Sequence, residues 1–107
     1  MRAPFERFKK SVTKDNLWIY ILTLLKEKEM YPYEIKRKIE ERFGFKPGNV
    51  TAYVVFNKLK FGGYIEVSKI KKLQGPERTY YKITKKGKEE LKQAIKFYEE
   101  WIKVLKT

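Results

Sequence analysis

The sequence predicts an α+β fold that is mainly helical and contains one small β-hairpin. Apolar residues recur at three- and four-residue intervals along most of the chain, which is typical of helices that bury one face. Two short β-patterned runs surround a Gly-Pro turn at residues 75–76 and indicate the hairpin. At 107 residues, the chain has room for one domain with a modest core.

The chain begins with two helical segments. Residues 1–14 carry five basic residues against one Glu, and their apolar side chains follow helical spacing, which predicts a short basic helical arm. A longer helix follows, which Asp15 or Asn16 can cap and which runs to about Lys28. Its apolar residues lie almost all the way round, so it has to be covered on more than one side. In so small a domain, this pattern indicates a second chain.

Two further helices are predicted, with a short turn between them. The first opens with Pro32, whose missing N–H costs nothing in the first turn of a helix, and Gly44 is placed to end it. The second runs from about Asn49 to Phe61, with apolar residues at i, i+4 and i+7 as its core stripe. The glycines at residues 62–63 stop it.

The hairpin and a final helix complete the chain. Strands are predicted over residues 64–71 and 78–83, and the alternation of apolar and polar residues in the first strand predicts one buried face. Thr84 then caps a long helix that reaches about Leu105.

The order helix, helix, turn, helix, hairpin, helix is the order of a winged helix-turn-helix. We therefore expect a winged helix-turn-helix with a long C-terminal dimerisation helix. The expected organisation is a basic helical arm at 1–14, a winged-helix DNA-binding domain at 15–84 and the dimerisation helix at 85–107.

The charge of the chain points to a polyanionic partner. There are 26 Lys and Arg against 13 Asp and Glu, a net charge of +13. Residues 69–88 hold eight basic residues against Glu77 alone, and no acidic residue lies between Lys46 and Tyr64. In a winged helix-turn-helix, the helix that corresponds to residues 49–61 enters the major groove and the hairpin reaches the adjacent backbone. We therefore expect double-stranded DNA as the partner. The candidate DNA-binding residues are Asn49, Thr51, Tyr53, Asn57, Lys58, Lys71, Lys72, Gln74 and Arg78.

The final helix carries a heptad-like apolar seam, and its far half has little of its own chain to pack on. In a dimer, the final helix of one chain could pack against the strongly apolar helix at residues 15–28 of its partner. This pairing explains both the apolar seam of the final helix and the apolar residues all round the other helix. The expected interface residues of this homodimer are Leu17, Trp18, Ile21, Leu91, Ile95, Tyr98, Trp101, Ile102 and Leu105. Trp18 and Trp101 are also candidate contacts for a flat aromatic effector; the alternative is that both are packing residues.

Several classes of function are disfavoured by composition. The chain has no Cys and no His, which removes disulfides, thiolate metal sites and the commonest general base, so neither an enzyme nor a cofactor is expected. The apolar run at 17–25 is too short to span a membrane, and residues 1–15 do not resemble a signal peptide. We expect a cytoplasmic protein without a membrane partner. The abundance of Lys, Glu, Ile and Tyr hints at a thermophile.

Three segments resemble the PadR family of transcriptional regulators. Residues 31–35 resemble the Tyr-Glu-Ile opening of the family's second helix, and residues 51–65 resemble its recognition helix and Gly turn. Residues 78–87 match the wing signature Arg-x-Tyr-Tyr-x-Ile-Thr-x-x-Gly, the most specific of the three. The resemblance covers about residues 16–105. It implies a homodimer that binds a palindromic operator, usually as a repressor, and that a phenolic or other planar aromatic effector releases in some members.

Alternatives to a sequence-specific regulator stay open at this stage. A basic wing also suits an RNA-binding winged helix or an architectural DNA-binding protein without sequence preference. A protein interaction module with incidental charge is a third possibility. Within the proposed site, Asn49 has an alternative role as a helix cap, Tyr53 as a core aromatic, and the hairpin lysines as solubilising residues.

Overall fold

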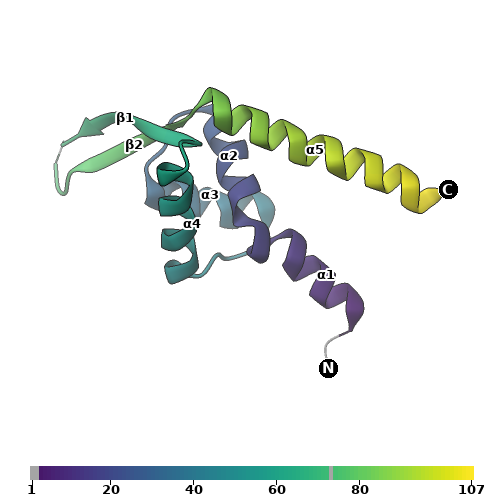
Figure 1. Cartoon of the computed structure of the whole chain (residues 1–107). Helices are drawn as coiled ribbons and strands as arrows, with labels where there is room; N and C mark the ends of the chain where they lie inside the picture. The colour runs from purple at the N-terminus through teal and green to yellow at the C-terminus, as the bar shows by residue number, and fades with distance from the viewer. Residues whose placement is uncertain (1–2, 73) are drawn as a thin grey trace.

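The structure, a computed structural model, describes residues 3–72 and 74–107. The described chain forms α-helices, one 3-10 helix (η1) and a two-stranded antiparallel hairpin. In chain order the elements are α1 (Pro4–Val12), η1 (Lys14–Asn16), α2 (Leu17–Glu27), α3 (Pro32–Phe43), α4 (Asn49–Phe61), β1 (Ile65–Lys71), β2 (Arg78–Ile83) and α5 (Lys85–Lys106). This is the predicted order of a winged helix-turn-helix with a long C-terminal helix. The hairpin projects on one side of the helical body and α5 runs away on the other (Figure 1).

Helix α2 forms the centre of the core. Its buried residues are Leu17, Ile21, Leu22, Leu24 and Leu25. They pack against α3, α4, α5 and β2 of the same chain. One protomer therefore covers much of this helix, but Trp18, Ile19 and Tyr20 are only partly buried, and the expectation that a second chain covers the rest stays a prediction. Among the described residues, no helix has the length and hydropathy of a membrane span.

The helix ends follow the sequence signals with one exception. Gly44 ends α3 in a left-handed conformation with φ of 77°, and Thr84 caps α5 by accepting a hydrogen bond from the Gly87 amide (3.1 Å). At the start of α2, neither Asp15 nor Asn16 provides a side-chain cap. The side-chain amide of Asn16 instead donates a hydrogen bond to the backbone carbonyl of Ser11, and Asp15 forms an ion pair with Lys10. Both side chains therefore face the α1 side of the junction.

Gly87 is required at the base of α5. A Cβ atom added there would lie 2.2 Å from the backbone oxygen of Tyr64 and 2.8 Å from the side chain of Ile83. Helix α5 therefore leaves the hairpin at a contact that only glycine allows.

The hairpin departs from simple alternation. Ile65 pairs with Ile83 at its base and Lys71 with Arg78 near its tip, but a bulge shifts the register between Val67 and Lys69. Ile65 and Val67 precede the bulge and keep the common face that the sequence predicts, but only Ile65, at the base of the hairpin, is buried, whereas Val67 is exposed.

A short segment between α2 and α3 holds the hairpin to the body. Met30 exchanges two backbone hydrogen bonds with Tyr81, of 2.9 and 3.2 Å. The carboxylate of Glu29 lies 3.3 Å from Nζ of Lys69 in β1, and the ring of Tyr31 packs edge-on against Tyr80 of β2. Three successive residues thus fix the orientation of the hairpin relative to the helices.

Candidate nucleic-acid interface

Helix α4 has a buried side and an exposed side. Phe56 and Leu59 are buried, and Ala52 and Val55 pack against the core beside them. Five residues without helical structure, 44–48, bring the chain from α3 to α4, and Pro47 among them is buried. Because this short connection restrains the start of α4, the helix presents a fixed face to solvent.

The predicted contacts on α4 are placed unequally. Thr51, Tyr53 and Lys58 are exposed, with 71% of Tyr53 accessible, so the alternative of a core aromatic at Tyr53 is wrong. Asn57 is half-buried. The side-chain oxygen of Asn49 accepts a hydrogen bond from Nζ of Lys36 in α3, and Asn49 is the first helical residue rather than the cap. Its carbonyl group is therefore partly engaged before any DNA is present.

The predicted contacts on the hairpin gather at its tip. Lys71, Lys72, Gln74 and Arg78 are all exposed. The guanidinium of Arg78 lies 4.6 Å from the centre of the Tyr31 ring, a cation–π contact with the segment before α3.

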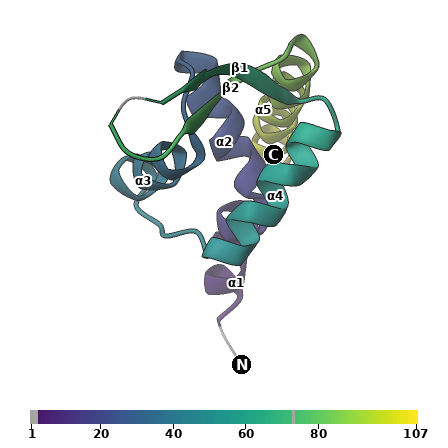
Figure 2. The same cartoon turned by 90° about the vertical axis from the view of Figure 1, so that its left-hand side faces the viewer.

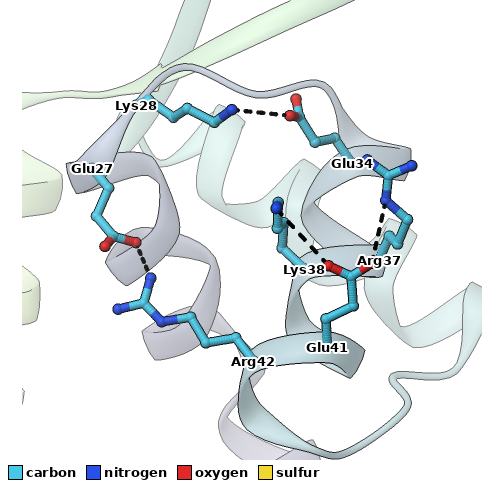
Figure 3. Close-up of polar contacts among 7 residues, drawn as sticks. All are labelled: Glu27, Lys28, Glu34, Arg37, Lys38, Glu41 and Arg42. Atoms are coloured by element: carbon cyan, nitrogen blue, oxygen red, sulfur yellow. Dashed lines mark hydrogen bonds and ion pairs between the residues drawn. The ribbon is translucent and has the colours of Figure 1, made fainter.

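The acidic residues are distributed so that the positive charge of α4 and the hairpin tip is left free. Cations of α3 and its approach are paired, as Figure 3 shows: Lys28 with Glu34, Arg42 with Glu27, and Arg37 and Lys38 with Glu41. On the hairpin, Lys69 and Lys82 are paired with Glu29 and Glu66. On α4 and at the hairpin tip, the cations form no ion pair with any described residue; they are Lys58, Lys60, Lys71, Lys72 and Arg78. Free cations are the groups that bind phosphates.

These elements frame one face of the molecule. Figure 2 looks onto this face, with α3 and α4 on either side and the hairpin above. A cleft of about 350 Å³ lies between the two helices. Buried Ile21 and Phe56 line its inner part, and exposed Tyr33, Tyr53 and Lys60 line its mouth. The arrangement places α4, the β1–β2 hairpin and unpaired cations together, as recognition of a duplex requires.

Comparison with protein families decides the identity of the chain. The model of the "Transcriptional regulator PadR-like family" matches residues 21–93. The chain belongs to the PadR-like family. This confirms the resemblance that the wing signature indicated, and it makes the chain a DNA-binding transcriptional regulator rather than a member of an enzyme family.

Individual proteins are similar to this PadR-like chain over most of its length. An uncharacterized protein of Lysinibacillus sphaericus is 35% identical over 95 residues, which cover 87% of this chain and 84% of that protein. A transcriptional regulator from Clostridium thermocellum has 31% identity and a TM-score of 0.77, over 89% of this chain and 94% of its own. PadR of Bacillus subtilis, solved in complex with operator DNA, has 26% identity and a TM-score of 0.68. The similarity to that protein covers 78% of this chain and 48% of its own.

Two residues on the exposed side of α4 in this PadR-like chain were not predicted as contacts from the sequence. Val50 and Val54 are both exposed, and neither was among the candidate contacts. Their spacing of four residues, opposite the stripe of Ala52, Phe56 and Leu59, is the signal that identifies them, because residues four apart share a helix face.

The predicted dimer residues of the PadR-like chain fall into two groups. Leu17, Ile21 and Leu91 are buried within the protomer, so a partner has no further surface of theirs to cover, and their assignment to an interface is wrong. Trp18 packs against the core and its Nε1 donates to Oδ1 of Asn16 (3.3 Å). The other predicted residues lie exposed on the outer part of α5: Ile95, Tyr98, Trp101, Ile102 and Leu105.

Proposed function

We propose that this PadR-like regulator binds a palindromic operator as a homodimer and acts as a repressor. Helix α4 lies in the major groove, and the hairpin tip contacts the neighbouring backbone. The observation that carries this proposal is that α4 and the hairpin, the elements that carry these exposed unpaired cations, border the same side of the protein (Figure 2). The complex of Bacillus subtilis PadR with operator DNA supports the same use of the fold.

The outer part of α5 supports the dimer. Along its apolar seam the exposed fraction rises from 2% at Leu91 to 79% at Leu105, because the helix leaves the body of its own chain. Phe97 and Trp101 add a pair of aromatic rings 5.7 Å apart. A second copy is the partner that matches this surface best, since a twofold axis pairs identical apolar seams. Such a dimer presents two α4 helices to half-sites related by a twofold axis, and hence to a palindrome.

The repressor role and release by an effector rest on the resemblance to the PadR family. A planar aromatic compound is the proposed effector, with Trp18 and Trp101 as candidate contacts. In one chain these two residues have different neighbours: Trp18 packs on the core and Trp101 on Phe97. A site containing both would therefore depend on the dimer. Quenching of tryptophan fluorescence by phenolic acids, together with release of bound DNA, tests this part of the proposal.

Selection of duplexes from a random pool tests the main proposal. We expect enrichment of an inverted repeat and, in gel shifts at fixed salt, binding at least about a thousandfold tighter than to scrambled duplexes. Equal affinity for every duplex would instead indicate an architectural protein. Preference for structured RNA over duplex DNA would overturn the proposal in favour of an RNA-binding function.

A further inference from the structure

The outward side of α4 is apolar at its centre. Val50 is 78% exposed and Val54 43% exposed, one helical turn apart, and Tyr53 lies between them. No described residue of the chain covers Val50. Single exposed apolar residues are common, but two aligned on the face that meets the ligand call for an apolar group in that ligand.

The cations around this stripe indicate which ligand it meets. Lys58 lies one turn beyond Val54 without an acidic partner in the described chain, and the hairpin tip adds Lys71, Lys72 and Arg78. An apolar protein partner would have to cover these cations without neutralising them. A duplex supplies phosphates for the cations and base edges for the helix between them.

The major groove contains only one apolar group that distinguishes base pairs, the C5 methyl of thymine. Other base edges present donors and acceptors that a valine leaves without a hydrogen bond, at a cost in desolvation. The two asparagines of α4 are poorly placed to read bases, because Asn49 is bonded to Lys36 and Asn57 is half-buried. Thr51 and Tyr53 stay exposed beside the two valines, so specificity at the N-terminal half of α4 combines polar contacts with apolar contact.

Resting on the proposed operator binding, we propose that Val50 and Val54 select thymine in each half-site by contact with its methyl group. The two residues are about 6 Å apart along the helix axis, at a rise of about 1.5 Å per residue. This length corresponds to one or two base steps, so the two methyl groups belong to neighbouring or next-neighbouring thymines. The N-terminal part of a recognition helix is the part that approaches base edges, which places both valines within reach.

Substitution of uracil for thymine in a selected duplex tests this inference. Uracil keeps the base pair, the groove acceptors and the phosphates and removes only the methyl group. We expect each contacted thymine to lose about fourfold in affinity on replacement, the effect of one buried methyl group. Replacing thymines outside the footprint should change nothing.

Two variants separate methyl contact from charge. The double variant Val50→Ala with Val54→Ala should bind the thymine and uracil duplexes with equal affinity. Lys58→Ala should weaken binding to both duplexes while keeping the ratio between them. Because Val50 and Val54 are exposed, their replacement leaves the core intact, and thermal melting by circular dichroism verifies this.

The outcomes distinguish this inference from the function on which it rests. Wild-type protein that prefers its selected duplex over scrambled DNA, but binds the thymine and uracil forms equally, overturns thymine selection and leaves operator binding standing. A thymine preference that survives in the double variant also overturns it. Protein with no preference among duplexes overturns the proposed function itself.

Discussion

The rings of Phe56 and Tyr81 meet edge to face, with their centroids 4.8 Å apart. Phe56 belongs to α4 and Tyr81 to β2, and both are buried. Tyr81 also shares two backbone hydrogen bonds with Met30, in the segment before α3. A single buried contact thus couples α4 to the hairpin and to the connection between α2 and α3.

Loss of this contact should destabilise the fold. We expect Phe56→Ala to lower the free energy of unfolding by about 3–5 kcal/mol, because it removes a buried ring and leaves a cavity. Urea denaturation measures the change. Phe61→Ala, at an exposed position of the same helix, is the matched control and should shift stability by less than about 0.5 kcal/mol. Similar losses in both variants would contradict the structural role of Phe56.

The unpaired cations of the hairpin tip should dominate the salt dependence of DNA binding. Replacing Lys71, Lys72 and Arg78 together by Ala should reduce the slope of log affinity against log salt by about three, one for each lost phosphate contact. Lys82→Ala is the control, because Lys82 lies 3.7 Å from Glu66 and its charge is already compensated. Fluorescence anisotropy between low and moderate salt gives the slopes, and an unchanged slope in the triple variant would remove the tip from the interface.

The attachment of the hairpin at Glu29 should weaken in acid. The hydroxyl of Ser68 and the ammonium of Lys69 stabilise the carboxylate and hold the pKa of Glu29 below its usual value of 4.5. A lowered pKa in the folded state contributes stability above pH 4.5 that is lost as the pH falls through the folded pKa. Wild type should therefore be more stable than Glu29→Gln at pH 7, and the two should converge below pH 4.5. A difference that does not shrink as the pH falls below 4.5 would assign it to something other than ionisation.

Tyr20 should confer a loss of stability in alkali. Burial, together with the nearby Tyr98, raises the pKa of Tyr20 above 10.0, and its hydroxyl donates to the backbone oxygen of Val12 (2.6 Å). A raised pKa in the folded state means that stability is complete below pH 10 and falls as the pH rises toward the folded pKa. Tyr20→Phe should lose about 1 kcal/mol at neutral pH with its hydrogen bond. Thermal melts above pH 10 should then fall less steeply for Tyr20→Phe than for wild type.

The dimer should depend on the apolar seam of α5. Ile102→Glu places a carboxylate in the proposed interface and should raise the dissociation constant about a hundredfold or more. Lys103→Glu introduces the same residue one position along, outside the seam, and should leave association intact. Sedimentation equilibrium separates the 13.0 kDa chain from its dimer. Identical masses for the two variants would contradict pairing along this seam.

Element boundaries were predictable because they depend on local chemistry. Pro32 starts α3, Gly44 ends it in a left-handed conformation, and Thr84 caps α5, each within its own few residues. The cap of α2 failed at Asn16 because its side chain bonds to a neighbouring helix, and local sequence does not encode that competitor.

Contacts between distant segments were not predictable from periodicity. The apolar pattern of α2 shows that the helix is surrounded, but not whether its own chain or a partner surrounds it. The same limit applies to Glu29, Met30 and Tyr31, which contact the hairpin from about forty to fifty residues away in sequence. Polar side chains are the usual readers of base edges, so the sequence made Asn49 a candidate contact and left Val50 out.

In the proposed dimer, Gly87 would determine the distance between the two α4 helices. With 22 residues and a rise of about 1.5 Å each, α5 is about 33 Å long, and the contact between Gly87 and Tyr64 near its start sets its direction. Each degree of tilt at this contact displaces the far end by about half an ångström over that length. A methyl group at position 87 would force α5 away from Tyr64 and, in a dimer joined at the far ends, would change the distance between the two α4 helices without contacting either DNA or the partner.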